Sequence, residues 1–491
     1  MSTPTTISPV DKLFVGGEWT SPASSKRIDL VTPSTAEVFT TIPDVTEADV
    51  DAAVRAARSS FDSGVWRKKS LDERIQVLSK VSELLGERID EVAGIITTEM
   101  GSPITLSTKM QAMGSKMLLD ALIELAPQYQ WRDTRKHATG NALVEKEPVG
   151  VVAAVVPWNA PLQISIIKLT PALLAGCSVV LKPTPQTALN AFFLADLLSQ
   201  AGLPEGVLSV LPADREVSAY LSSHPGVDKV SFTGSTAAGR KVAAQCGNDL
   251  RRCTLELGGK SAAVVLADAD LDQVIPAIRA LSLRNTGQVC SNKTRIVAAR
   301  SIRDELNDRL AEMMRSMPVG DPFDPDVEIG PLASAAQLER VLGYIESGKS
   351  SGAGLLLGGD RPSDLGAGYY VSPTVFTDVD PNAKIAQEEI FGPVLTTHYF
   401  DTEEEAIAIA NNSDYGLNGS VFSADVYHAL DVAREIRTGT VEVNGNGGGF
   451  YAPIGGFKNS GIGREAGLEG FDAYVEIKSY GLPAEVVDTF A

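Results

Sequence analysis

One cysteine and one glutamate of this chain are residue types that can carry out acyl chemistry. Cys290 ends the segment Thr286-Gly287-Gln288-Val289-Cys290, and Glu256 lies upstream in Leu255-Glu256-Leu257-Gly258-Gly259-Lys260. The thiolate is the reactive form of cysteine, and a free thiol with a pKa of about 8.5 is only slightly ionised at neutral pH. A carboxylate in an apolar setting can take that proton, or can later take one from water. The same residues also fit a small buried cysteine without a chemical role, so alone they leave both interpretations open.

The composition is that of an ordinary globular protein and argues against several classes of function. The 491 residues are 44% hydrophobic and 21% charged, and the chain is long enough for two or three domains with large cores. The formal charge of -19 argues against nucleic acid as a partner, because phosphate binding needs an excess of Lys and Arg. The 4 cysteines and 4 histidines include no close cysteine pair or histidine cluster, so we predict neither a disulfide framework nor a metal site.

The ends and the hydrophobic runs of the sequence indicate no targeting segment. Residues 1–6 lack the charged and apolar stretches of a secretory signal, and residues 488–491 are not a known address tag. No run approaches the about 18 apolar residues that a membrane span requires. We therefore expect a cytoplasmic protein without a membrane partner.

Residues 46–125 read as helices. Thr46 is a suitable N-cap for the run that begins at Glu47. Met110, Met113 and Met117 recur at helical spacing and share one face, which indicates either core packing or the lining of a binding site. Between residues 128 and 149 the helical periodicity gives way to more polar, strand-like pieces.

From Val149 onward the chain alternates β-branched runs with helical segments, which is typical of parallel α/β units. The runs of a first series lie at residues 150–156, 178–181, 206–211 and 229–233. A second series starts near Gly259 and includes residues 295–298, 419–422 and 440–444. No repeat or flexible linker separates the two series, so we expect two closely packed α/β domains.

Seven short blocks follow one another in an order that carries more information than any one of them. They are Val156-Pro157-Trp158-Asn159, Val180-Leu181-Lys182-Pro183, Phe232-Thr233-Gly234-Ser235-Thr236, the segments around Glu256 and Cys290 quoted above, Glu388-Glu389-Ile390-Phe391-Gly392-Pro393, and Pro453-Ile454-Gly455-Gly456-Phe457-Lys458-Asn459-Ser460-Gly461. Together they resemble the NAD(P)-dependent aldehyde dehydrogenase superfamily over nearly the whole chain. The resemblance implies an α/β fold with a Rossmann-type cofactor domain (1–126 and 149–258), an α/β catalytic domain (259–470) and β oligomerisation segments (127–148 and 471–491). Such segments build homodimers or homotetramers in the family.

The resemblance also implies catalytic roles for five residues. Cys290 would attack the aldehyde carbon, and the Asn159 amide and the Cys290 backbone N–H would stabilise the resulting oxyanion. Glu256 would activate the water that releases the acid, with Lys168 and Glu465 as a proton relay behind it. CoA-acylating members typically lack a carboxylate at the position of Glu256, so we expect a free carboxylic acid as product. For Lys168, a charge at a helix surface is the competing interpretation.

NAD is the expected cofactor, and NADP is left open. The sequence lacks G-x-G-x-x-G, but Gly234–Arg240 joins a strand to a helix through small residues, where pyrophosphate can reach free backbone N–H groups. Alone, such a turn is more often a plain connection. By resemblance the cofactor-binding residues are Val156, Trp158, Lys182, Thr184, Arg215, Gly234, Ser235, Leu257, Glu389 and Phe391. Arg215, a candidate partner for a 2′-phosphate, also fits a solvated surface charge.

The predicted substrate pocket is apolar and has less ring volume than in many members of the family. Ala160 stands where many relatives carry a large aromatic residue, and Ile454 replaces the aromatic residue of a Pro-Phe-Gly-Gly pattern. The expected lining residues are Met113, Met117, Ala160, Ile164, Ile167, Val289, Phe450 and Ile454. No Arg or Lys is evident there to pair with a carboxylated substrate. We therefore expect medium-to-large apolar aldehydes, such as terpenoid, long-chain or aryl ones.

Two other functions are compatible with parts of this pattern. A non-catalytic relative that keeps the fold for binding or structure would be expected to lose Cys290 or Glu256, and both are present. A cysteine esterase or thioesterase would not need the cofactor positions at Trp158, Lys182 and Glu389. Formation of reduced nicotinamide from an aldehyde distinguishes a dehydrogenase from both.

Substitution of Pro185 tests the choice of cofactor. Many relatives carry a glutamate three residues after the lysine matched by Lys182, where it binds ribose hydroxyls and repels a 2′-phosphate, whereas Pro185 does neither. A like-charge clash in a partly desolvated site can reach several kcal/mol, so Pro185→Glu is expected to shift the ratio of kcat/KM values strongly towards NAD. Rejection of NADP by more than about a thousandfold in the parent, or an unchanged ratio in the variant, would contradict this interpretation.

Overall fold

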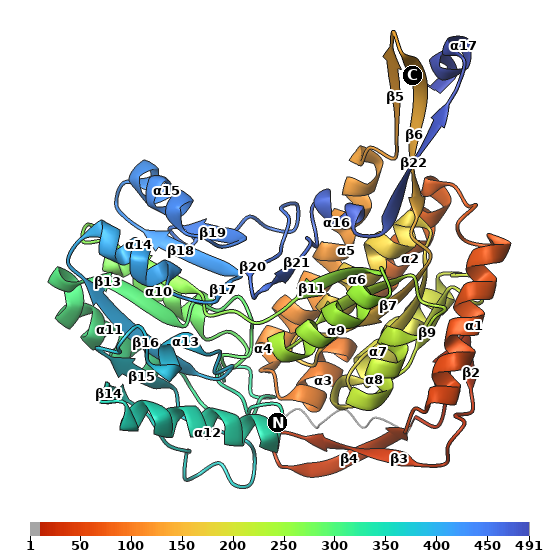
Figure 1. The fold of residues 1–491 in the computed structure, drawn as a ribbon. Helices are drawn as coiled ribbons and strands as arrows, with labels where there is room; N and C mark the ends of the chain where they lie inside the picture. The colour runs from red at the N-terminus through yellow and green to blue at the C-terminus, as the bar shows by residue number, and fades with distance from the viewer. Residues whose placement is uncertain (1–9, 491) are drawn as a thin grey trace.

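The structure, a computed structural model, describes residues 10–490. It consists of two α/β lobes and an arm of antiparallel strands that projects from one of them (Figure 1). The expectation about residues 1–6 lies outside the described residues. Among residues 10–490, no helix is long and apolar enough to cross a membrane.

The helices expected between residues 46 and 125 are present. They are α1 (Glu47–Ser63), α2 (Leu71–Glu87), α3 (Ile89–Met100), α4 (Ile104–Leu106), the π-helix η1 (Ser107–Met113) and α5 (Gly114–Leu125). Thr46 is the N-cap of α1, as predicted. The Asp49 carboxylate accepts hydrogen bonds from the Thr46 backbone N–H at 2.9 Å and from the Thr46 hydroxyl at 2.7 Å. Two short hairpins precede these helices, β1 (Leu13–Val15) with β2 (Glu18–Thr20) and β3 (Arg27–Thr32) with β4 (Glu37–Pro43).

The first lobe is built on an eight-stranded sheet whose centre is parallel. Its strand order is β2-β1-β9-β8-β7-β10-β11-β21, where the parallel strands are β7 (Val151–Val155), β8 (Ser178–Lys182), β9 (Leu208–Val210), β10 (Lys229–Thr233) and β11 (Arg252–Glu256). The connecting helices are α6 (Pro161–Ala175), α7 (Leu189–Gln200), α8 (Arg215–Ser223) and α9 (Thr236–Asn248). The chain runs outward from β7 to β9 and then returns to β10, so a topological switch lies between β7 and β10, where α/β sheets bind ligands.

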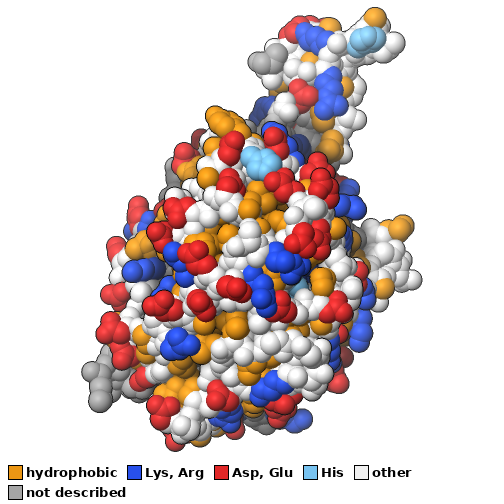
Figure 2. All heavy atoms as spheres, turned by 90° about the vertical axis from the view of Figure 1, so that its left-hand side faces the viewer, with side chains coloured by type: hydrophobic (Ala, Val, Ile, Leu, Met, Phe, Trp, Pro, Cys, Tyr) orange, Lys and Arg blue, Asp and Glu red, His pale blue; other side chains and the backbone are white. Residues whose placement is uncertain are grey.

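The second lobe contains a seven-stranded sheet in the order β14-β15-β16-β13-β12-β18-β19. Its strands are β12 (Ala262–Val265), β13 (Arg295–Ala299), β14 (Gly354–Leu357), β15 (Thr374–Thr377), β16 (Val394–Phe400), β18 (Asn418–Phe422) and β19 (Thr440–Val443). Its main helices are α10 (Leu271–Ser282), α11 (Arg303–Arg315), α12 (Ala335–Ser350), α14 (Glu403–Asn411) and α15 (Val426–Glu435). Both predicted series of parallel strands are therefore confirmed. Figure 2 shows acidic and basic side chains dispersed over the outer face of this lobe.

The arm combines the two segments that were expected to pair across chains. Here β5 (Arg132–His137), β6 (Gly140–Pro148) and β22 (Val475–Gly481) form one antiparallel sheet within a single chain, with β6 in the centre. The sequence alternates Val475 and Ile477 with Tyr474, Glu476 and Lys478, which predicts a half-buried strand. Val475 is buried as predicted, but Ile477 is 71% exposed. The expectation was wrong for Ile477 because the arm stands clear of the lobes, so that no core in this chain covers its side chain (Figure 1).

Candidate active site

Two cavities meet at Cys290. One, of about 360 Å³, lies towards α6 and η1, and the other, of about 250 Å³, lies towards the N-terminus of α9. Cys290, Asn159 and Thr233 line both cavities. A group in either cavity can therefore lie next to Cys290.

Cys290 follows a backbone turn of unusual conformation. Asn285, Thr286 and Gly287 have φ values of 54°, 57° and 78°, in a left-handed region that a β-branched threonine rarely adopts. Hydrogen bonds hold the turn, because the Thr286 hydroxyl donates to the Gly330 carbonyl at 3.2 Å and accepts from its N–H at 3.0 Å. A Cβ atom on Gly287 would lie 1.9 Å from the carbonyl oxygen of Gly392, so only glycine fits there.

Asn159 is fixed beside the nucleophile as an oxyanion donor would need to be. It is buried, follows β7, and its side-chain amide donates to the Gln288 carbonyl at 3.0 Å. Its own carbonyl accepts from the amides of Asn285 at 2.9 Å and Gln111 at 3.3 Å. Because an amide nitrogen carries two hydrogens, one N–H of Asn159 is left to face the reacting atom.

Glu256 ends β11 and lines the larger cavity together with Glu465. Burial, with the nearby charge of Glu465 adding to it, raises the pKa of Glu256 well above its ordinary value, and Lys168 opposes that shift. The Lys168 ammonium is fully buried, lies 2.6 Å from a Glu465 oxygen, and donates to the Ser231 hydroxyl at 3.1 Å. The alternative of a surface charge for Lys168 is therefore wrong, because α6 packs this side chain against β10 and not towards solvent.

The thiol of Cys290 is in an environment that disfavours its charge. Burial raises the pKa of the Cys290 thiol to about 12, and the carboxylates of Glu389 and Glu256 add to the effect. Arg284 acts in the opposite direction. In this state a base must accept the proton when the sulfur attacks, which is a role that Glu256 can fill.

The smaller cavity contains most of the predicted cofactor-binding residues. Those that line it are Trp158, Gly234, Ser235, Leu257, Glu389 and Phe391. The rings of Trp158 and Phe391 meet edge to face with centroids 5.4 Å apart, and a Glu389 oxygen accepts from the Gly259 N–H at 3.0 Å. Ser235 caps α9, whose first N–H groups open towards this cavity, and the buried Thr233 hydroxyl has no hydrogen-bond partner among the described residues. A helix N-terminus with free N–H groups, beside a hydroxyl that still has a hydrogen bond to make, fits a dinucleotide pyrophosphate.

The other predicted cofactor residues lie further along the same sheet edge or outside it. Val156 is buried and pairs its N–H with the Lys182 carbonyl at 3.0 Å. Lys182 is buried at the end of β8, and burial lowers the pKa of its ammonium to about 8. Thr184 lies two residues beyond it, and Arg215 is exposed at the start of α8. The exposed side chain of Arg215 matches the interpretation as a surface charge.

Two residues of the cofactor cavity lie outside the seven sequence blocks. Gln337 and Arg340 lie one turn apart on α12, and the Gln337 amide donates to the Phe391 carbonyl at 2.7 Å. They fix the backbone that carries Phe391, whose φ of 63° is also left-handed. Gln337 and Arg340 have the spacing of any two neighbours on a helix face, so the sequence alone does not identify them as cofactor-cavity residues.

Six of the eight predicted substrate residues line the larger cavity, namely Ala160, Ile164, Ile167, Val289, Phe450 and Ile454. Met113 and Met117 do not, because they face outward and are 42% and 55% exposed; Met110 lines the cavity instead. The π-helix adds one residue to the turn before α5, which shifts the face that the helical spacing had assigned. The alternative prediction, that these two methionines pack in the core, is also wrong because both side chains are exposed.

The lining of the larger cavity also contains a charge that we did not expect. Arg284 lies in its wall, together with the polar residues Gln111, Gln163 and Ser291. The expectation that no Arg or Lys is available there is wrong. The left-handed turn at residues 285–287 reverses the chain, so that a residue six positions before Cys290 faces the same cavity.

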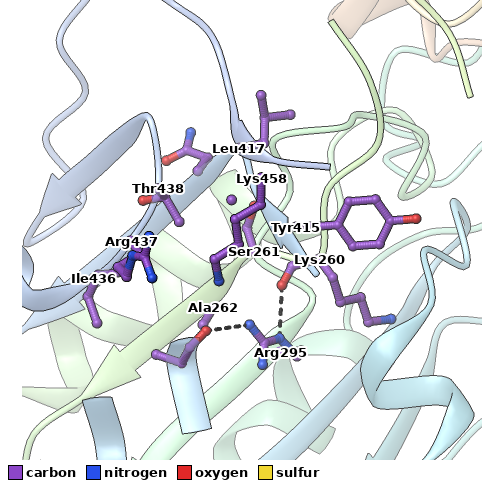
Figure 3. A pocket seen from close by; sticks show the side chains of 13 residues that line it. Lys260, Ser261, Ala262, Arg295, Tyr415, Leu417, Ile436, Arg437, Thr438 and Lys458 are labelled. Carbon is purple, nitrogen blue, oxygen red and sulfur yellow. Dashed lines mark hydrogen bonds between the residues drawn. The ribbon is translucent and has the colours of Figure 1, made fainter. Parts of the chain in front are cut away.

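A third, much smaller cavity lies behind the segment that follows Glu256. It has a volume of about 10 Å³, which is room for about one water molecule. Figure 3 shows the buried Arg295 guanidinium donating to the Lys260 carbonyl, a bond of 2.8 Å, while the Lys260 ammonium points away. Arg295 also donates to the carbonyls of Ile409 at 2.9 Å and Ala410 at 2.8 Å. This cavity is too small for a substrate, and Arg295 there ties the backbone of three segments together.

Comparisons with known proteins agree with this geometry. Residues 19–480 match the model of the aldehyde dehydrogenase family. The chain belongs to this family. It is 44% identical over 468 residues to the geranial dehydrogenase of Castellaniella defragrans, covering 95% of this chain and 98% of that protein.

Two solved structures are similar to this aldehyde dehydrogenase over nearly their whole length. The Mycobacterium tuberculosis aldehyde dehydrogenase complexed with NAD⁺ superposes with a TM-score of 0.95 at 46% identity, covering 97% of this chain and 98% of that one. A variant of aldehyde dehydrogenase C from Pseudomonas syringae, complexed with NAD⁺ and octanal, gives 0.94 at 38% identity, covering 98% of each chain. The fold class predicted from the sequence is therefore confirmed.

Gly287→Ala is expected to disable this aldehyde dehydrogenase by moving the turn that carries Cys290. The new Cβ would lie 1.9 Å from the Gly392 carbonyl oxygen, so the backbone must shift. We expect a loss of stability of about 1–3 kcal/mol and a fall in turnover on the order of 100-fold. Denaturant unfolding and steady-state kinetics measure both.

Gly352→Ala is the matched control for that substitution. Gly352 has a similar φ of 82°, but nothing lies within 4 Å of a Cβ atom placed there. Alanine at position 352 has the same unfavourable backbone conformation but no steric clash, so this variant should retain turnover. Wild-type turnover in Gly287→Ala would show that the position of the loop does not depend on Gly287.

Proposed function

We propose that this chain oxidises an aldehyde to the free carboxylic acid with NAD, through a thiohemiacetal and a thioester on Cys290. The observation that carries the proposal is the position of Cys290 and Asn159 at the junction of the two cavities. The comparison structures complexed with NAD⁺ support NAD as the cofactor. The smaller cavity would hold it through the N-terminus of α9, Glu389 and the walls formed by Trp158 and Phe391.

The first half of the reaction forms and oxidises the adduct. The Cys290 sulfur bonds to the carbonyl carbon while its proton passes to Glu256, and the oxygen becomes an oxyanion held by the Asn159 amide and the Cys290 backbone N–H. The bound nicotinamide supplies the acceptor for the hydride that leaves this carbon. Loss of the hydride restores the C=O bond, and the acyl group is left on sulfur as a thioester.

The second half of the reaction releases the acid. After the thiol proton has left Glu256, this carboxylate takes a proton from water, the water oxygen bonds to the acyl carbon, and the C–S bond breaks to leave the Cys290 thiolate. Glu465 and Lys168 lie behind Glu256 and can pass its proton onward, because they form a buried pair that already shares a hydrogen bond of 2.6 Å. The carboxylate at position 256 is the reason that we propose water, and not CoA, as the acyl acceptor.

The substrate is proposed to have a medium-to-large apolar body. The larger cavity is walled mainly by aliphatic and aromatic side chains, among them Ile164, Ile167 and Phe450. Relatives that act on apolar aldehydes support this size and polarity, since one is named for geranial and another was solved with octanal. Ala160 and Ile454 stand at positions where many members of the family carry aromatic rings. The smaller side chains leave room for such a body.

Esterase or thioesterase activity is the competing function of the same cysteine. It would use Cys290, Asn159 and Glu256 without the second cavity. Because the smaller cavity keeps Trp158 and Glu389, we propose hydrolysis of esters as at most a side reaction.

The division of the chain and its location are also proposals. We propose a cofactor domain at residues 1–126 and 149–258, a catalytic domain at 259–470, and oligomerisation segments at 127–148 and 471–491. The boundaries follow the two sheets, although β21 (Gly461–Ile462) of the catalytic domain pairs with β11 of the cofactor domain. Cytoplasmic residence is a further proposal.

Glu256→Gln is expected to separate the two halves of the reaction. If an alternative acceptor takes the thiol proton, the variant should give a pre-steady-state burst of reduced cofactor and then turn over slowly. In the parent, steady turnover should rise with pH, because burial raises the pKa of Glu256 and only its deprotonated form takes a proton from water. That rise should be absent in the variant.

Cys290→Ala is the control for the burst experiment and the test of the proposed function. It should bind NAD and keep its unfolding transition while losing both aldehyde oxidation and ester hydrolysis. Steady turnover of Glu256→Gln at the parent rate would remove Glu256 from the hydrolytic step. More than a trace of aldehyde oxidation by Cys290→Ala would overturn the whole assignment.

We propose a homodimer or homotetramer built through the arm. The edges of β5 and β22 are unpaired within the described chain, and the exposed Ile477 places an apolar side chain beside one of them. Light scattering at micromolar concentration is expected to give a multiple of 51.9 kDa. A particle of the monomer mass would contradict this proposal, and Ile477→Lys should shift the equilibrium towards that mass.

A further inference from the structure

Two cysteines that the proposed reaction does not use lie on neighbouring elements of the first lobe. Cys246 is in the last turn of α9, and Cys253 is the second residue of β11. The opposite ends of the same two elements carry Ser235, in the cofactor cavity, and Glu256. A bond between the two cysteines would therefore tie α9 to β11 at the ends that point away from the active site.

A tight turn brings the two cysteines together. The Arg251 backbone N–H donates to the Cys246 carbonyl at 2.7 Å, and Leu250 within the turn has a left-handed φ of 53°. Both cysteines pack in the apolar core of this lobe, where their thiols form a hydrogen bond with each other. Both thiols are free. The two sulfur atoms are therefore already neighbours, as the formation of a disulfide requires.

The surroundings make one sulfur a nucleophile and leave the other protonated. The hydrogen bond from Cys246 lowers the pKa of Cys253 to about 6 against the effect of burial, and the charge of Lys229 adds to the lowering. Lys229 is on the adjacent strand β10 and donates to the Thr254 hydroxyl at 2.7 Å. The same hydrogen bond, together with burial, raises the pKa of Cys246. At neutral pH, Cys253 is therefore the thiolate and Cys246 is the thiol that faces it.

A small oxidant can reach this pair without entering the active site. Cys253 is partly exposed, whereas Cys246 is buried. The turn that joins them borders solvent, because Leu250, Arg251 and Arg252 line a surface cavity of about 570 Å³. Neither cysteine lines the two cavities that meet at Cys290.

The other two cysteines of the chain are in less reactive surroundings. Cys177 is buried, its thiol donates to the Tyr474 carbonyl at 3.5 Å, and burial raises its pKa to about 12. Burial also raises the pKa of Cys290. Both thiols therefore hold their protons at neutral pH, unlike Cys253.

We propose that Cys246 and Cys253 are a redox-active dithiol that a hydroperoxide converts into a disulfide. The Cys253 sulfur bonds to one peroxide oxygen, the O–O bond breaks, and the departing oxygen takes a proton from water, so that Cys253 becomes a sulfenic acid. The Cys246 sulfur then bonds to the Cys253 sulfur, and the S–O bond breaks. The oxygen leaves as water with the Cys246 proton. Two thiols are oxidised and one peroxide is reduced, and this inference does not depend on the proposed aldehyde oxidation.

Peptide mapping of the oxidised full-length chain tests the proposal. Arg251 and Arg252 lie between the two cysteines, so trypsin separates them, and a disulfide would join the peptides of residues 242–251 and 253–260. Hydrogen peroxide should produce this linked pair, and dithiothreitol should remove it. In Cys290→Ala, which keeps three of the four cysteines, the thiols titrated in denaturant should fall from three to one.

The double variant Cys177→Ala/Cys290→Ala is the matched control, because it keeps the pair, and its thiols should fall from two to none. Cys253→Ala should yield no linked peptides. Cys246→Ala should leave Cys253 as a sulfenic acid that dimedone traps. Thermal unfolding reports whether each variant is folded, and the mapping of the unsubstituted chain needs no variant. If the oxidised parent lacks the linked peptides, or joins either cysteine to Cys177 or Cys290 in their place, the proposal is wrong.

Discussion

The active site depends on a short left-handed turn that is held from two sides. Asn285, Thr286 and Gly287 would relax to ordinary backbone conformations if they were free. The Gly330 backbone holds Thr286, the carbonyl of Asn159 accepts from the amide of Asn285, and Gly287 lies against Gly392. Because Asn159 follows a strand of the first sheet and Gly392 precedes a strand of the second, the turn fixes Cys290 where the two lobes meet.

The electrostatics of the site follow from that burial. A thiol and several carboxyl groups share a volume with little water, so each resists ionisation unless a partner is provided. Lys168 compensates Glu465 and leaves Glu256 with a raised pKa, which suits a group that must hold a proton and then release it. The same burial lowers the pKa of the Arg284 guanidinium, and the carboxylate of Glu442 opposes that shift.

The sequence predicted the parts of the site that follow the ends of strands. Trp158 and Gly234 follow β-branched runs closely, and parallel strands bring such positions to one edge. Met113 and Met117 were misplaced because a π-helix interrupts the helical spacing. Arg284 was missed for a related reason, since only a backbone of unusual φ brings it to the cavity and glycine is its one visible marker. The exposure of Ile477 depends on how far the arm stands from the lobes, which local patterns do not encode.

The turn also links reactivity to specificity. Residues on both sides of it face the same cavity, with Arg284 before it and Val289, Cys290 and Ser291 after it. Arg284 also contacts the segment after the turn, because its guanidinium donates to the Ser291 hydroxyl at 3.1 Å and to the Asn292 side-chain oxygen at 3.4 Å, next to the nucleophile. The residues that set the polarity of the cavity and those that place the sulfur are therefore coupled within one loop. A substitution at Arg284 would change the charge of a cavity that Glu256 and Glu465 also line, and it would remove two hydrogen bonds beside Cys290.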